Sequence, residues 1–280
     1  MKGAAMLTPH RVRLDVEAYL DAVQRLMAPL PPVTVGLAEA LGRELAEPVH
    51  SRLPLPPFDN SAMDGYALAG PGETYRLMAD VAAGDHRSLS LRAGQAARVM
   101  TGARLPTGTT AVLPVEQARV EAGQVSATAP VRPGQHIRLR GEDAAQGQLV
   151  LAAGAALGPV QLAAAAACGA GRVSVRSRPR VAVVVTGSEL TDPDGAPGPG
   201  GIFDSNSTLL RTACLKAGAV MASHERLPDQ PGRTAKVLER AGAASDLVLV
   251  SGGVSAGAYD YVRDSIAALG GTVAAVAMRP

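Results

Sequence analysis

The chain has 280 residues, a length that favours about two domains and allows hydrophobic cores to form without disulfides or metals as staples. Its 27 Lys and Arg residues against 25 Asp and Glu give a net charge of +2, which excludes a broad basic surface for nucleic acid. The sequence shows no signal peptide and no run of roughly 18 apolar residues, so we expect a cytoplasmic protein without a membrane partner.

Helical signals come first along the chain. Apolar residues recur at helical spacing over residues 12–30, and Thr34 is placed to cap a second helix that Pro48 ends. Further along, Pro159 and Gly169 frame an Ala-rich apolar helix, because proline is tolerated in a first helical turn and glycine is favoured just past a helix end. We expect this helix to pack with the N-terminal helices.

The segment between these helices has a different texture. Residues 51–140 consist of short apolar runs broken every few residues by Gly and Pro, which predicts a small β-rich domain. The segments before and after it, 1–50 and 141–177, are expected to form one discontinuous domain of helices and extended linkers.

From residue 178 onward, strands and helices alternate regularly. Residues 181–185 are a continuous β-branched run, which is typical of a strand buried on both faces. This order predicts a parallel sheet with right-handed crossovers, so we assign 178–280 to an α/β domain and the chain to the multidomain α/β class. The later elements are expected as helices at 207–217, after Pro231 and at 261–269, and as strands at 219–227, 247–250 and 272–278.

Polar and glycine residues follow the first three of these strands, at the edge where parallel sheets bind ligands. Glycine-rich turns let backbone N–H groups approach a phosphate, and carboxylates beside phosphates commonly hold Mg²⁺. Asp229 and Asp260 each precede a helix and fit the role of N-cap equally well, so the residues alone leave both interpretations open. The residues at this edge are Thr186, Gly187, Ser188, Glu189, Asp229, Ser251, Gly252, Gly253, Ser255 and Asp260.

Common phosphate-binding signatures are absent. The segment SGGVSAG lacks the Lys-Ser/Thr ending of a P-loop, and no GxGxxG opens a helix after the first of these strands. These absences argue against an NTPase and against a dinucleotide-dependent dehydrogenase.

A short polar loop, PPFDNSAMDGYAL at residues 56–68, combines two carboxylates with Phe58, one of two phenylalanines in the chain. Turn residues gather in loops whether or not a loop has chemistry, so the composition fits an ordinary turn as well as a site. For Asp64 we expect a turn-stabilising role.

Six segments occur in an order that resembles the MoeA family of molybdopterin molybdenumtransferases, which are similar to the E-domain of gephyrin. The resemblance runs from about residue 12 to the last residue. The segments are FDNSAMDGYAL, RVMTGARLPTGTTAVLPVE, RGEDAAQG, VVTGSEL, GIFDSN and SGGVSAGAYDYV.

The resemblance implies an enzyme that inserts molybdenum from molybdate into adenylated molybdopterin with Mg²⁺ and releases AMP. It also implies a homodimer whose active site is shared between subunits, with a MogA-like pterin-binding α/β domain, and a MogA-like adenylyltransferase as a further partner. The family's remaining α/β residues and its C-terminal β-barrel domain are expected to be missing from this chain.

Site residues follow from the resemblance motif by motif. Asp59, Thr101 and the nearby Asp143 would be contributed by the β-rich domain of one subunit. Glu189, Asp229 and Asp260 would form the pterin side in the other subunit, with Glu189 and Asp260 as Mg²⁺ ligands. The substrate-binding residues would be Thr186, Gly187, Ser188, Ser251, Gly252, Gly253, Ser255 and Arg279.

The sequence departs from the family pattern in its last motif. Ala275 stands where the family has a first Lys, and Arg279 lies near the position of a second; an arginine can still bind an oxyanion. These departures favour an alternative, a binding or scaffold module that holds the pterin without turnover. A third candidate, a competence-damage-like nucleotide hydrolase, shares the α/β module, but FDNSAMDGY and GEDAAQG argue against it.

Overall fold

The computed structural model describes residues 13–253, 261–271 and 275–276. They form two compact units: the β-rich unit, Thr34–Val175, and the α/β unit, Met1–Val33 with Arg176–Pro280. Each unit contains apolar clusters of its own, so each has its own core. The division into three segments at residues 51, 141 and 178 stays a prediction.

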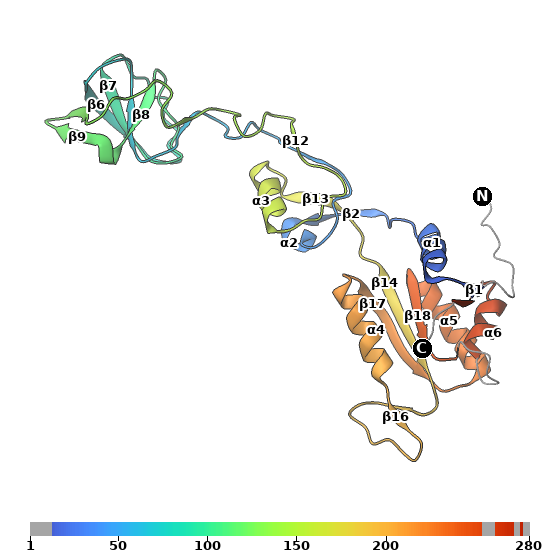
Figure 1. Ribbon diagram of the computed structural model, residues 1–280. Coiled ribbons are helices and arrows are strands. Elements are labelled where there is room, and N and C mark those ends of the chain that lie inside the picture. Colours follow the sequence, from blue (N-terminus) through green and yellow to red (C-terminus); the bar gives the residue numbers. More distant parts are fainter. Residues whose placement is uncertain (1–12, 254–260, 272–274, 277–280) are drawn as a thin grey trace. The chain divides into compact units, whose positions relative to one another are not determined.

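A six-stranded sheet lies in the β-rich unit, and the predicted β-rich character is confirmed (Figure 1). Its paired strands are antiparallel except β6 and β7, which run parallel. Because successive residues of a strand face opposite sides, Val99 and Val112 join one buried cluster whereas Leu68 and Leu113 join another. The strands are, across the sheet, β8 (Ala111–Pro114), β5 (Gly65–Leu68), β7 (Gln95–Val99), β6 (Thr74–Val81), β10 (Gln124–Ala127) and β9 (Ala118–Glu121).

Another apolar cluster of the same unit surrounds Leu45 and Val175, both fully buried. The predicted Ala-rich helix is confirmed here as α3, with Pro159 at its first position and Gly169 in the left-handed region at φ 83°. It packs with α2, as the sequence predicts for a helix of the N-terminal segment. The elements are β2 (Pro32–Gly36), α2 (Leu37–Ala40), β3 (Val49–His50), β12 (Leu149–Leu151), α3 (Pro159–Ala167) and β13 (Arg172–Arg176).

The predicted helix after Thr34 is wrong in extent and in its cap. Thr34 lies in strand β2, and α2 is a single turn that begins after Gly36, well before Pro48. Two β-branched valines flank Thr34, which favours a strand, and β13 supplies the hydrogen-bonding partner from far along the chain. Periodicity within the segment could not indicate that partner.

The α/β unit contains a parallel sheet in the order β17-β14-β18, and its predicted alternation of strands and helices is confirmed. Two further short strands, β15 and β16, pair in parallel beside it. The elements are β14 (Arg180–Thr186), β15 (Leu190–Thr191), β16 (Ile202–Phe203), α4 (Ser205–Lys216), β17 (Val220–Leu227), α5 (Pro231–Ala244), β18 (Leu247–Ser251) and α6 (Tyr261–Ala268).

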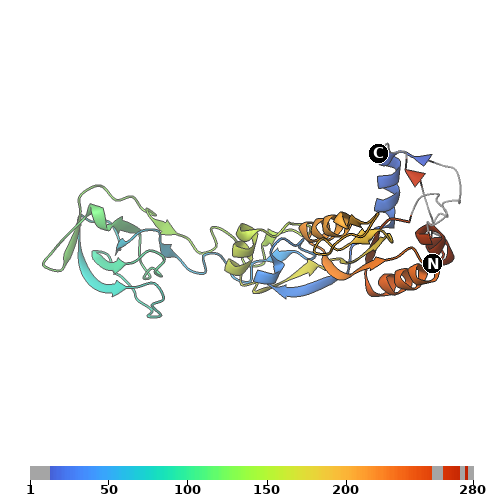
Figure 2. The same cartoon turned by 90° about the horizontal axis from the view of Figure 1, so that it is seen from below.

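Helices cover both faces of this sheet (Figures 1 and 2). Val181, Val183 and Val185 of β14 pack with Cys214 of α4, whereas the alternate residues of β14 pack against α5 and α6. This burial on both faces explains the continuous apolar run at 181–185 and completes the layered arrangement that the sequence predicts.

The strand expected at 272–278 does not join the three-stranded sheet within the described residues. Its described part, β19 (Ala275–Val276), pairs in parallel with β1 (Arg13–Leu14). Backbone groups require a hydrogen-bonding partner, and here an N-terminal segment supplies it. A pairing across such a sequence separation leaves no local signal.

The predicted N-terminal helix is confirmed as α1 (Val16–Leu26), shorter than the 12–30 expected. Asp15 caps it by accepting a hydrogen bond of 2.7 Å from the Ala18 N–H. Across the described parts of the chain, each helix is too short or too polar to cross a bilayer.

Candidate functional site

Two other segments of the β-rich unit converge on the loop that carries Asp59. The Leu105 N–H donates to the Asp59 carbonyl at 3.0 Å, and the Gly102 N–H donates to the Ser61 carbonyl at 2.8 Å. The Arg140 N–H donates to Asp59 Oδ1 at 2.7 Å, and β4 (Asn60–Ser61) pairs with β11 (Ile137–Arg138). The tertiary structure thus joins the segments FDNSAMDGY, MTGARLP and RLRGED around one polar side chain.

Asp64 contacts Thr101 rather than its own turn. Its Oδ1 accepts hydrogen bonds from the Thr101 N–H and the Thr101 hydroxyl, both at 2.7 Å. The Thr101 hydroxyl and then the Thr101 N–H lower the pKa of Asp64 below its ordinary value, and Arg98 acts in the same direction. The Asp64 side chain therefore bonds the turn at Thr101 and Gly102, 37 positions along the sequence, rather than the turn of its own loop.

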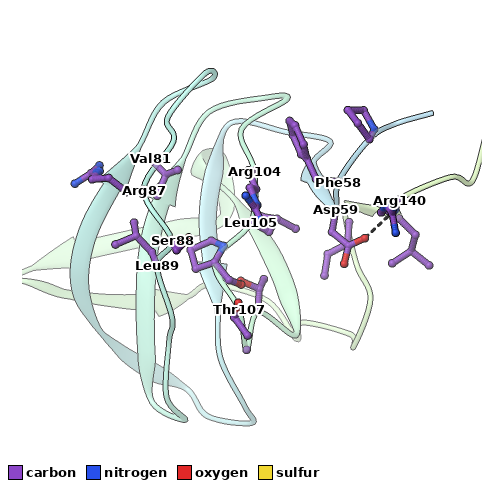
Figure 3. Close-up of a pocket in the computed structure, with 16 residues that line it drawn as sticks. Phe58, Asp59, Val81, Arg87, Ser88, Leu89, Arg104, Leu105, Thr107 and Arg140 are labelled. Atoms are coloured by element: carbon purple, nitrogen blue, oxygen red, sulfur yellow. Dashed lines mark hydrogen bonds between the residues drawn. The ribbon is translucent and has the colours of Figure 1, made fainter. Parts of the chain in front are cut away.

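A cavity of about 700 Å³ opens beside Asp59 (Figure 3). Asp143 and Thr101 do not line it, and the Asp143 N–H donates instead to the Leu55 carbonyl at 2.9 Å. Three guanidinium-bearing residues and several hydroxyl groups make the walls suitable for an anionic or polar ligand. Its polar lining includes Asp59, Arg87, Ser88, Arg104, Thr107, Thr109 and Arg140.

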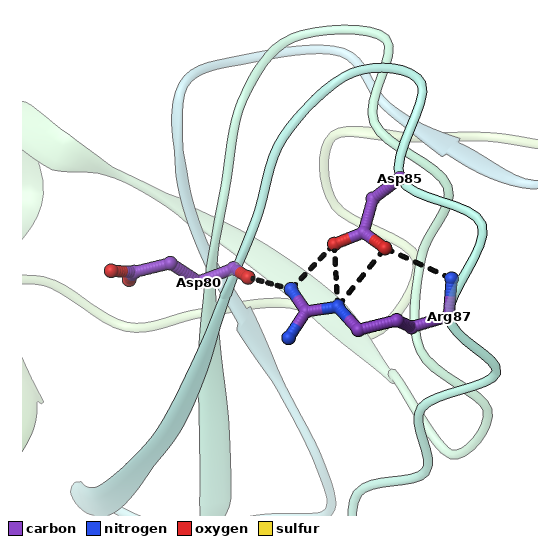
Figure 4. A network of polar contacts seen from close by, with 3 residues as sticks. All are labelled: Asp80, Asp85 and Arg87. Atoms are coloured by element: carbon purple, nitrogen blue, oxygen red, sulfur yellow. Dashed lines mark hydrogen bonds and ion pairs between the residues drawn. The ribbon is translucent and has the colours of Figure 1, made fainter.

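One of these arginines is held by an ion pair (Figure 4). The Nε of Arg87 donates to both oxygens of Asp85 at 3.0 and 2.9 Å, and its terminal nitrogen donates to the Asp80 carbonyl at 2.6 Å. The Arg87 side chain and then its N–H hold the pKa of Asp85 at about 2. Where Arg87 lines the cavity, its guanidinium is therefore already paired with Asp85.

The ion pair predicts a pH dependence. Because the pKa of Asp85 is depressed in the folded state, its stabilising contribution is fully present above the ordinary value of 3.8 and is lost as the pH falls through about 2. A carboxyl titration by NMR should show a midpoint near 2, and Arg87→Gln should raise it toward 3.8. An unchanged midpoint in Arg87→Gln would show that the contact does not form in solution.

In the α/β unit, the turns after β14 and β17 are hydrogen-bonded to one another. The Ser188 N–H donates to Asp229 Oδ2 at 3.1 Å, and the Asp229 N–H donates to Ser188 Oγ at 3.1 Å. The N-cap of α5 is Gln230, which has no side-chain cap bond, so the interpretation of Asp229 as an N-cap is wrong. Asp229 instead fixes the turn that presents Glu189, an exposed carboxylate.

The turn after β18 lies directly against the end of β14. Gly252 and Gly253 have φ of 91° and 61°, and a Cβ on Gly252 would lie 2.3 Å from the Thr186 carbonyl oxygen. The Thr186 Oγ1 is buried and has no hydrogen-bond partner among the described residues. Glycine is therefore required at position 252 by both conformation and space.

A polar network at the start of α4 was not indicated by the sequence analysis. Asn206 donates to Ser251 Oγ at 2.9 Å, and Ser207, which donates to the N-cap Asp204, lies 2.7 Å from His224 Nε2. Burial raises the pKa of Asp204, but the hydrogen bonds from Ser207 outweigh it, so this pKa lies below its ordinary value. Asp204, an N-cap residue type directly before the helix, was the available helix-start signal.

Three of the predicted site residues, Ser255, Asp260 and Arg279, lie outside the described residues. Within the described ranges, no group of three or more His, Cys, Asp or Glu side chains could hold a metal ion. The described turns after the strands do bring together Thr186, Ser188, Asp229, Ser251 and Gly252, as the sequence predicts for one sheet edge.

Comparisons with known proteins indicate the same family for both units. A family model described as MoeA N-terminal region (domain I and II) matches residues 14–169, and one described as Probable molybdopterin binding domain matches 182–280. A molybdopterin molybdenumtransferase 2 of Mycobacterium tuberculosis (strain ATCC 25618 / H37Rv) is 39% identical over 90% of this chain, and a molybdopterin molybdenumtransferase of a Nostoc species is 36% identical over 96%. The chain spans 64% of the length of each.

Further relatives extend this agreement. A molybdopterin molybdenumtransferase of Staphylococcus aureus (strain MSSA476) is 31% identical over 98% of this chain, which spans 68% of its length. A crystal structure of the molybdopterin biosynthesis moeA protein from Pyrococcus horikoshii OT3 superposes with a TM-score of 0.77 and 31% identity, over 86% of this chain and 67% of that protein. The sequence, the matched residues and the fold thus agree, and the chain belongs to the MoeA family.

Proposed function

We propose that the chain acts in molybdenum-cofactor biosynthesis as a molybdopterin molybdenumtransferase, which inserts molybdenum from molybdate into adenylated molybdopterin and releases AMP in a Mg²⁺-dependent reaction. The observation that carries this proposal is the convergence of the family segments within each unit. Asp59 and its neighbouring loops meet in the β-rich unit, and the turns after β14, β17 and β18 meet in the α/β unit.

The sheet edge of the α/β unit is suited to the phosphorylated pterin. Glycine turns allow close approach of a phosphate to backbone N–H groups. The buried Thr186 hydroxyl lacks a partner among the described residues, and such a group costs about 1–3 kcal/mol until something supplies a hydrogen bond. A bound ligand would supply that bond, and Ser188 and Ser251 offer further hydroxyls.

The donor set at this edge fits Mg²⁺. The ion prefers oxygen ligands, keeps several waters and is commonly held by one or two carboxylates together with substrate phosphates. Glu189 is exposed and free of hydrogen bonds within the described ranges, and Asp229 uses only Oδ2 to hold Ser188. Glu189 would hold the ion, with Asp260 proposed as a second ligand. When bound, Mg²⁺ would neutralise phosphate charge, while Asp229 keeps the turn in place.

A homodimer is part of the proposal. Helix α1 has no buried residues, although its apolar residues recur at helical spacing. Val16, Leu20 and Leu26 are 44%, 51% and 78% exposed, and such a face favours an interface. We propose that the active site is shared between subunits, with Asp59 and Thr101 from one and Glu189 from the other.

The alternative is a module that binds the pterin without turnover. Ala275 favours it, because a cation that could offset the charge of an oxyanion is absent at this position. The two functions differ in one measurable respect, the release of AMP.

The decisive experiment incubates the purified chain with adenylated molybdopterin and measures AMP by chromatography. We expect AMP release that requires both molybdate and Mg²⁺. Binding of adenylated molybdopterin in calorimetry without AMP release would support the binding module instead, and a chain that neither binds nor releases would contradict both.

The Mg²⁺ site predicts a specific variant. Glu189→Gln should raise the Mg²⁺ concentration needed for half-maximal ligand binding by about tenfold to a hundredfold, because a neutral amide is a poorer ligand than a carboxylate. Glu239→Gln, a change at an exposed position of α5, is the matched control and should leave this concentration unchanged. Equal behaviour of the two variants would remove Glu189 from the proposed site.

A further inference from the structure

The contact between Asp64 and Thr101 has a chemical direction. Asp64 Oδ1 lies 2.7 Å from both the nitrogen and the hydroxyl oxygen of Thr101. An ionised carboxylate only accepts hydrogen bonds, whereas a hydroxyl has one proton and two lone pairs. The Thr101 hydroxyl must therefore be the donor in this contact, and only its lone pairs remain for other groups.

The charge state supports this assignment. The hydroxyl and N–H of Thr101 lower the pKa of Asp64, with Arg98 acting in the same direction, so the carboxyl group is ionised near neutral pH. Both residues are exposed, so the lone pairs of the hydroxyl are accessible to a ligand.

The main chain holds the two residues in place. The Val115 N–H donates to the Asp64 carbonyl at 3.0 Å, and Gly102, next to Thr101, donates to the Ser61 carbonyl at 2.8 Å. Gly102 has φ 78°, a conformation that glycine adopts readily and that turns the chain directly after Thr101. A geometry fixed before a ligand arrives lowers the entropy cost of binding.

We propose that Asp64 is a positioning residue that holds the Thr101 hydroxyl proton toward its own carboxylate. The free lone pairs of Thr101 then accept a hydrogen bond from an N–H group of the substrate's heterocycles. The inference rests on the proposed function and deepens it by assigning a hydrogen-bond acceptor to the part of the site that Thr101 contributes. Molybdate and phosphate oxygens bearing no proton are acceptors, so they do not bind at the Thr101 hydroxyl. Asp64 itself need not touch the substrate.

The first test needs no substrate. NMR titration of the Asp64 carboxyl group in the full chain should give a pKa that is higher in Thr101→Val than in the unsubstituted chain, and unchanged in Thr101→Ser, which keeps the hydroxyl. Thr128→Val is the matched control, because Thr128 donates its hydroxyl elsewhere in the same unit, to the Gln117 carbonyl at 3.0 Å. An Asp64 pKa that is the same in Thr101→Val and Thr128→Val would overturn the proposal.

The second test is a double-mutant cycle on AMP release. Asp64→Ala, which removes the acceptor, and Thr101→Val should each lower kcat by about twofold to tenfold, the range expected for one neutral hydrogen bond. If Asp64 acts only through Thr101, the double variant should be no slower than Thr101→Val alone. Thr101→Ser should retain most of the rate. Losses that multiply in the double variant would show that Asp64 acts independently, which overturns the positioning role.

A third measurement tests whether the Thr101 hydroxyl donates a hydrogen bond to an oxyanion. Molybdate alone, titrated by calorimetry, should bind Thr101→Val and the unsubstituted chain with affinities within about twofold, because losing one good hydrogen bond would cost more than that. A large loss of molybdate affinity in Thr101→Val would mean that the hydroxyl donates to the oxyanion, against the proposal. A chain that releases no AMP would contradict the proposed function, whereas the carboxyl titration would still decide whether Asp64 orients Thr101.

Discussion

Replacement of Gly252 by Ala is expected to destabilise the α/β unit by about 2–5 kcal/mol and to abolish ligand binding at its sheet edge. A left-handed backbone conformation costs an L-residue about 1–2 kcal/mol, and forcing extra atoms into a packed site costs about 1–3 kcal/mol more. Both apply, since φ is 91° and the new Cβ would lie 2.3 Å from the Thr186 carbonyl oxygen. Urea unfolding and calorimetric titration with adenylated molybdopterin measure the two effects.

Gly218→Ala separates the two causes. Gly218 has φ 82° in the same unit, and a Cβ there would meet nothing within 4 Å. We expect it to lose only the conformational part, about 1–2 kcal/mol, and to bind ligand normally. If Gly252→Ala lost no more stability than Gly218→Ala, the close approach to Thr186 would not constrain this turn.

The second large effect concerns Asp59. Asp59→Ala and Glu189→Ala are each expected to lower AMP release by about a hundredfold or more, in line with the removal of one well-placed electrostatic group. After subunit exchange in an equal mixture, half of the dimers are mixed, and each mixed dimer has one intact site of two. A shared site therefore predicts recovery of about one quarter of the unsubstituted rate.

The complementation result depends on proven exchange. Differently tagged subunits that co-purify after mixing show that mixed dimers exist, and circular dichroism shows that both variants are folded. A mixture of Asp59→Ala with Asp143→Ala should recover nothing, because both changes lie in the β-rich unit of the same proposed half-site. No recovery with Glu189→Ala despite exchange would place Asp59 and Glu189 in the same subunit.

Much of the α/β unit was predictable from the sequence. The uninterrupted apolar run at 181–185 indicated a strand buried on both faces, α4 lies close to the predicted 207–217, and α5 begins at Pro231, where a helix was expected to start. These features are local: they depend on the period of apolar residues and on Pro and Gly at helix ends, which a single segment contains in full.

The predictions that were wrong depend on contacts between segments that are far apart in the sequence. Thr34 was expected to cap a helix, yet it lies in β2 because β13 pairs with that segment. Likewise β19 pairs with β1, more than 250 residues away in sequence. A strand is completed by hydrogen bonds to another segment, and the identity of that segment is not written in the strand's own residues.

The candidate site, like the fold, was predictable from the sequence only in its local features. The sequence by itself determined which polar and glycine residues follow the strands, and the family motifs pointed to Asp59, Thr101 and Glu189. Only the tertiary structure decided that Asp64 contacts Thr101 and that Asp229 holds Ser188 rather than capping α5. The physical reason is that hydrogen-bond partners are selected by distance and direction in space, after the chain has folded, and segments remote in sequence meet only then.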